Sequence, residues 1–150
     1  MPAFFTFGRI LFAVLFIYLG ATKLFGLQAT ADFIATKVTI PAVLAPYATQ
    51  IETATGMTTP QLLAIAGGVF EVIAGLMIAF NFAARFFAII LIFYVAAATF
   101  YFYDFWNQTP PENGKMLVDA LKNLAIIGAL FMIAGYGRGP RAGEPAYGDV

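Results

Sequence analysis

Hydrophobic residues gather into four long segments of this chain, and polar residues separate them. A helix that crosses a bilayer core of roughly 30 Å needs about 20 mostly apolar residues. Segments of that kind occupy residues 4–25, 61–80, 84–103 and 116–136. The pattern predicts an all-α fold, an integral membrane four-helix bundle, with residues 1–137 as its transmembrane domain.

The connections between these segments differ in length and character. Residues 81–83 are so short a link that the second and third segments should form an antiparallel hairpin. Residues 107–115 (NQTPPENGK) are typical of a turn-rich surface loop, and residues 138–150 of a flexible polar tail. Between the first two segments, apolar residues recur at helical spacing, which predicts a short interfacial helical segment. Its apolar positions are Ile40, Val43, Leu44, Tyr47 and Ile51.

Composition agrees with a membrane protein, since 61% of the residues are hydrophobic and 11% are charged. Eight basic and eight acidic residues give zero net charge, so we expect neither nucleic acid nor strongly anionic lipid to bind a polycationic surface. The chain has no cysteine and no histidine, which removes thiolate and imidazole ligands. We therefore expect no metal site and no cofactor bound covalently or through a metal.

Lysine and arginine are divided equally between the two sides of the predicted membrane topology. Lys23 and Lys122 count less toward the orientation, because both lie within predicted spans and can be paired with acids there. The orientation that follows places both termini in the cytoplasm.

Glu71 stands alone in an otherwise uncharged apolar segment. Its helix is expected to begin near Pro60, which puts the carboxylate roughly 16 Å deep in the bilayer. A charge at such a depth costs about 2.5 to 3.5 kcal/mol, so Glu71 should face a partner or take up a proton. Gly67 and Gly75 share its helical face and should let another helix approach closely.

Two lysines on other spans are the predicted partners of Glu71. Lys23 follows the stripe Arg9, Ala13, Phe16 and Gly20, and Lys122 precedes the stripe Ala125, Ala129, Met132 and Gly135. Asp104 ends the third span. The candidate ligand or proton-handling residues are Lys23, Glu71, Asp104, Lys122 and Asn123. The same residues could form a structural ion network that fixes helix register, and no residue is assigned a catalytic role.

Aromatic residues are concentrated at the end of the third span, in FYFYDFW at residues 100–106. Such a block is typical of an interfacial aromatic belt, and a ring-binding pocket is the alternative. The candidate pocket residues are Tyr94, Tyr101, Tyr103 and Trp106.

Four stretches resemble the DoxX-like family of four-helix membrane proteins. They are GRILFAVLFIYLGATKLFG, GGVFEVIAGLMIAFNFAARFFAIIL, ATFYFYDFWN and KNLAIIGALFMIAG. The resemblance implies a bacterial inner-membrane bundle, and family members have been linked to quinone-coupled sulfur oxidation and to oxidoreductase assemblies. Many relatives carry histidine where Tyr103 stands, so an imidazole proton carrier is not available at this place.

Three functions fit these observations. The first is a non-catalytic membrane subunit or scaffold of a redox assembly, with a protein partner that carries the chemistry. The alternative is a quinone- or lipid-binding oxidoreductase subunit, in which a lysine binds a quinone oxygen and an acid exchanges protons. A small transporter ranks last, because the chain lacks the broken helices and paired repeats of such folds. Whether the protein is an enzyme stays open.

Overall fold

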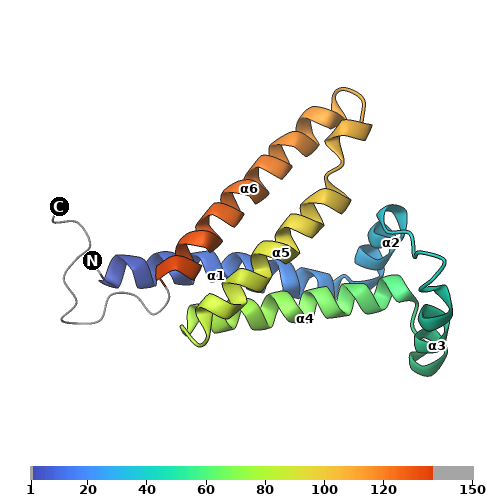
Figure 1. Cartoon of the computed structure of the whole chain (residues 1–150), viewed down its shortest axis with the longest axis horizontal. Helices are drawn as coiled ribbons and strands as arrows, with labels where there is room; N and C mark the ends of the chain where they lie inside the picture. Colours follow the sequence, from blue (N-terminus) through green and yellow to red (C-terminus); the bar gives the residue numbers. More distant parts are fainter. Residues whose placement is uncertain (1, 137–150) are drawn as a thin grey trace. The chain divides into compact units, whose positions relative to one another are not determined.

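A computed structural model describes residues 2–136 of the chain, and these residues form helices and connections without any strand. The elements in chain order are α1 (Pro2–Phe25), α2 (Leu27–Lys37), α3 (Ala45–Thr55), α4 (Thr59–Ala79), α5 (Ala84–Phe102), the short 3-10 helix η1 (Phe105–Asn107) and α6 (Glu112–Tyr136), as Figure 1 shows. The predicted all-α class is confirmed.

Four of these helical segments are long and apolar enough to cross a membrane. They are Ala3–Phe25, Thr59–Ala79, Ala84–Asn107 and Glu112–Tyr136. The loop predicted at residues 107–115 is shorter than expected, because α6 already begins at Glu112. Glu112 suits the positive end of the helix dipole, and its carboxylate pairs with Lys115 at 2.9 Å. The predicted tail at residues 138–150 lies outside the described residues.

The chain divides into two compact units. The described part of the first unit contains residues 2–14 and 74–136, and the second unit contains residues 15–73. The helices α1 and α4 each contribute to both units.

The second unit contains the helical segment predicted between the first two spans, which is divided into α2 and α3. Pro46 lies in the first turn of α3, where a proline costs no helical hydrogen bond. Gly56 ends α3 in the left-handed region with φ of 69°, which glycine adopts without strain. Tyr47 and Ile51 of the predicted apolar face are exposed, as expected for a helix that lies on a membrane surface.

In the first unit, α4 is joined to α5 by a tight turn. Asn81 and Ala83 both have positive φ, and the Phe82 amide donates to the Met77 carbonyl at 2.9 Å. After this turn α5 and α6 run antiparallel and side by side (Figure 1). The buried face of α5 consists of Ala84, Ala88, Leu91 and Val95, at helical spacing.

The buried face of α6 differs from the one that the sequence suggested. Leu130 and Ile133 are buried, whereas Ala125, Met132 and Gly135 of the predicted small-residue stripe are exposed. Within the described residues, the small-residue stripe is therefore not the buried face of this helix. Large apolar residues occur all round this helix, so the positions of its small residues do not identify the side that packs.

Candidate functional site

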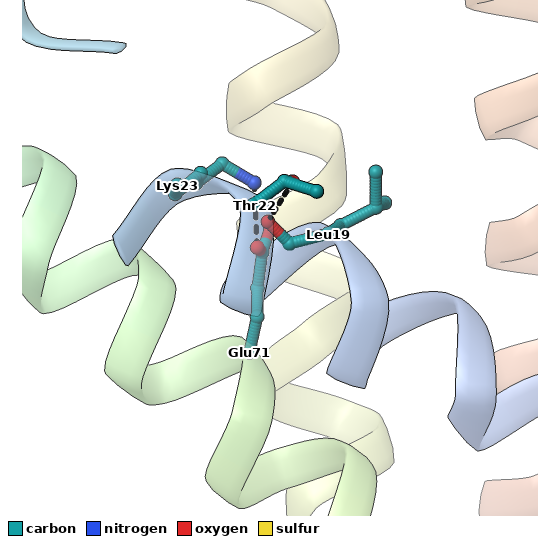
Figure 2. A network of polar contacts seen from close by, with 4 residues as sticks. All are labelled: Leu19, Thr22, Lys23 and Glu71. Carbon is teal, nitrogen blue, oxygen red and sulfur yellow. Dashed lines mark hydrogen bonds and ion pairs between the residues drawn. The ribbon is translucent and has the colours of Figure 1, made fainter. Parts of the chain in front are cut away.

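A buried ion pair joins α1 to α4 within the second unit. The Lys23 ammonium lies 2.5 Å from Oε2 of Glu71 and donates a hydrogen bond to it (Figure 2). The Glu71 side chain is 5% exposed and the Lys23 side chain is 28% exposed. Of the two lysines predicted as partners, Lys23 makes this contact, and it neutralises the acid inside the apolar segment.

Close backbone contact places the two charged side chains opposite each other. A Cβ atom added to Gly20 would lie 2.5 Å from the carbonyl oxygen of Gly68, so only glycine fits there. Lys23 follows Gly20 by three residues, and Glu71 follows Gly68 by three residues. Because residues three apart share a helical face, the glycine contact brings the lysine and the glutamate together.

On the sequence alone, Gly67 rather than Gly68 was placed on the face of Glu71. Gly68 is buried and Gly67 is not. Both lie within one helical turn of Glu71, at spacings of four and three, and both spacings place a residue on the same face of a helix. The sequence alone therefore does not show which of Gly67 and Gly68 contacts the partner helix.

Neighbouring polar groups form their own bonds. The Thr22 hydroxyl donates to the Leu19 carbonyl of its own helix at 2.9 Å and leaves the carboxylate to Lys23 (Figure 2). The Gln61 amide donates to Gln28 at 3.1 Å, and Gln28 donates to Asp32 at 2.8 Å. This link between α4 and α2 was not predicted from the sequence, because neither glutamine lies in a charged pattern.

Glu52 caps the start of α4 from outside the membrane span. Its Oε1 accepts hydrogen bonds from both the hydroxyl and the amide of Thr59, each at 2.6 Å. These bonds favour the ionised carboxylate and lower the pKa of Glu52 below its usual value, the hydroxyl contributing most.

A second polar group occupies the end of the first unit where α5, η1 and α6 meet. Asn123 donates to the Thr99 hydroxyl at 3.0 Å, and Gln108 donates to Asp104 at 3.2 Å. Lys122 pairs with Asp119 on its own helix at 2.9 Å, and the Lys122 side chain is 68% exposed. The predicted site residues thus fall into two groups, one in each unit.

The aromatic candidates belong to the second group. Tyr101 and Trp106 are exposed, whereas Tyr94 and Tyr103 are partly buried. The Trp106 ring packs against Phe100 with centroids 5.5 Å apart and against Phe105 with centroids 5.0 Å apart. These rings pack on one another at the end of α5, an arrangement that suits a membrane boundary.

A cavity of about 300 Å³ lies between α2, the segment after it and the start of α4. Its walls are mainly apolar and include Ile34, Val38 and Leu63, with Thr39 and Thr59 as polar groups. Neither Lys23 nor Glu71 lines this cavity. The ion pair is therefore not part of its surface.

Comparison with known proteins agrees with this architecture. The DoxX family model matches residues 4–104, which is more than half of the chain. "Inner membrane protein YphA" of Escherichia coli (strain K12) is 27% identical over 138 residues, covering 92% of this chain and 86% of that protein. No solved structure matches the chain. With four apolar spans and an inner-membrane relative of nearly equal extent, the chain belongs to the DoxX family and is a multi-pass inner-membrane protein.

Proposed function

We propose that this chain is a non-catalytic membrane subunit that anchors and stabilises a redox assembly in the inner membrane. The observation that carries the proposal is the internal neutralisation of Glu71 by Lys23. An acid that is already paired and buried offers little accessible surface to a substrate. The pair instead holds α1 and α4 in one register.

The redox part of the proposal rests on the family and on the composition. The sequence resembles proteins that have been linked to oxidoreductase assemblies, yet it contains no cysteine and no histidine. Redox cofactors bound through thiolate or imidazole would therefore be held by a partner subunit, while this chain supplies position in the membrane.

The exposed side of α6 is the surface that we assign to the partner. Nothing lies within 4 Å of a Cβ atom added to Gly128 or Gly135, and Ala125 is exposed on the same helix. In lipid, small residues allow two helix backbones to approach closely, and this contact is a main source of helix association. A partner helix that packs here would fill the space beside both glycines.

The test is affinity purification of the full chain from its native membrane. We expect Gly128→Leu to lose the co-purifying subunits that carry haem, flavin or iron–sulfur clusters, while its thermal midpoint in detergent is unchanged. Gly8→Leu is the matched control, because Gly8 is also an exposed helical glycine with nothing within 4 Å. Equal recovery of partners by both variants, or the absence of any cofactor-bearing partner, would contradict the proposal.

A second candidate function is quinone or lipid binding where α5, η1 and α6 meet. The partly buried Tyr103 and Asn123 at this end, next to the packed rings of Phe100 and Trp106, support it. Mass spectrometry of the purified chain tests this candidate. A bound quinone that is lost in Asn123→Leu and kept in Asn107→Leu, without co-purified redox subunits, would favour ring binding over recruitment.

A further inference from the structure

Arg9 is a buried cation for which the described residues provide no acid. It is 8% exposed, and its Nε atom is enclosed without a hydrogen-bond partner. Arg9 precedes Ala13 and Phe16 on the inward-facing side of α1, where both of these residues are fully or nearly fully buried. An enclosed guanidinium with an unpaired nitrogen is costly unless an anion completes its hydrogen bonds.

The surroundings of Arg9 belong to one end of the first unit, where α1 and α5 begin and α6 ends. Phe5 packs against Tyr136 with ring centroids 5.5 Å apart, which joins the start of α1 to the end of α6. Arg85 donates to the Gly135 carbonyl at 3.1 Å, which joins the start of α5 to the same place. We call this region, defined by these five residues, the basic end.

The acidic residues in the described part of the first unit lie away from the basic end. Within residues 2–14 and 74–136, the acids are Asp104, Glu112 and Asp119, which lie beside η1 or in the first turns of α6. The Oδ1 atom of Asn81, in the turn just before α5, is also enclosed and unpaired. The basic end thus combines two guanidinium groups, one unpaired acceptor and no carboxylate among the described residues.

We propose that Arg9 binds the phosphate of a membrane phospholipid headgroup at the basic end. Arginine is well suited to phosphate, because its planar group donates two parallel hydrogen bonds to two oxygens. The Arg9 Cα lies roughly 10 Å along α1 from the start of the helix, and the long side chain can reach further toward the headgroups. Exposed rings of Phe4, Phe82 and Phe86 on α1, in the turn and on α5 provide apolar contacts for acyl chains.

This site is compatible with the zero net charge of the chain. Zero charge argues against a broad cationic surface that attracts anionic lipid from a distance. A single enclosed arginine acts at short range, where one charge-assisted bidentate contact is enough to retain one lipid.

The experiment measures lipid retention by native mass spectrometry of the full chain in detergent, after titration with phosphatidylglycerol. We expect Arg9→Gln to reduce retention about fivefold, since one basic residue near an anionic lipid surface contributes on that order. Arg9→Lys should keep part of the binding, because lysine keeps the positive charge but cannot donate two parallel hydrogen bonds to the phosphate. Lys115→Gln, which removes an exposed lysine, should retain lipid like the unchanged chain.

Measurements on the unchanged chain also test the lipid assignment, and they apply even if Arg9→Gln does not fold. For the unchanged chain, phosphatidylglycerol should raise the thermal midpoint, and inorganic phosphate at equal concentration should raise it much less. An equal effect of free phosphate would overturn the lipid assignment. The lipid assignment would also be overturned if the chain retained no phosphatidylglycerol and the double variant Glu144→Gln, Asp149→Asn were less stable than the unchanged chain. The anion at Arg9 would then be a carboxylate of the protein itself.

Discussion

Two lysine–carboxylate pairs in this protein have similar chemistry and opposite settings. Lys23 and Glu71 come from different helices, and the acid is almost fully buried. Lys122 and Asp119 lie three residues apart on α6, and both side chains are exposed. A pair between helices constrains how the two helices pack, whereas a pair within one exposed helical turn constrains only its own side chains.

Exposure decides which pair matters for stability. An exposed pair competes with water and is screened by salt, so it contributes little. A buried pair makes each charge depend on the other, because neither can return to water without moving a helix. The comparison predicts a graded series of effects.

Removal of Lys23 should produce the largest loss of stability. Lys23→Met leaves the Glu71 carboxylate enclosed without its partner, and we expect the free energy of unfolding to fall by about 3 kcal/mol. Unfolding in mixed micelles with increasing SDS measures it, with Lys115→Met as the exposed control. The double variant with Glu71→Gln should lose less than the sum of the two single variants. Additive losses would mean that the two residues do not interact.

Gly20→Ala should come next, with a loss of about 2 kcal/mol. The added methyl group would lie 2.5 Å from the Gly68 carbonyl oxygen, so the helix backbones must separate. The same unfolding measurement applies, and Gly8→Ala is the matched control in open space. If Gly20→Ala were as stable as Gly8→Ala, close backbone contact could not be what positions the ion pair.

Thr99→Val should have an intermediate effect of about 0.6 to 1 kcal/mol. It removes the hydroxyl that accepts the Asn123 hydrogen bond between α5 and α6. Thr36→Val is the control, since the Thr36 hydroxyl bonds only the Phe33 carbonyl of its own helix in the described contacts. Equal losses in the two variants would assign the effect to the threonine side chain alone.

Glu52 should give a local, pH-dependent effect. Its pKa is lowered in the folded state by the Thr59 hydrogen bonds, so its contribution is complete above the ordinary value of 4.5 and is lost as the pH falls through the lower folded pKa. Protection of the Thr59 amide from hydrogen exchange should therefore decrease as the pH falls from above 4.5 through the lower folded pKa of Glu52. In Glu52→Gln the protection should be lower at the start and nearly constant across this range.

Lys122→Gln should have the smallest effect, below about 0.5 kcal/mol, and salt should abolish it. Unfolding at low and high salt measures this difference. A loss as large as that of Lys23→Met would show that Lys122 has a partner more important than Asp119.

Local features of the fold followed from sequence pattern to different degrees. The spans were predicted because length and apolar content alone determine whether a helix can cross a bilayer. The division of the segment between them into α2 and α3 was less precise, since short amphipathic helices have weak signals. The start of α6 at Glu112 was missed because asparagine, glycine and proline nearby are typical of turns.

The sequence by itself determined that Glu71 needs a partner, because a charge in an apolar span is costly wherever the helix lies. It also determined the family and the membrane class, which depend on composition and on ordered motifs. Only the tertiary structure decided that Lys23 is the contacting lysine, that Gly68 is the glycine in close contact with Gly20, and that Arg9 is enclosed without an acid among the described residues. The physical reason is that helical periodicity gives the face of each helix, whereas the rotation and approach of two helices depend on side-chain packing between them.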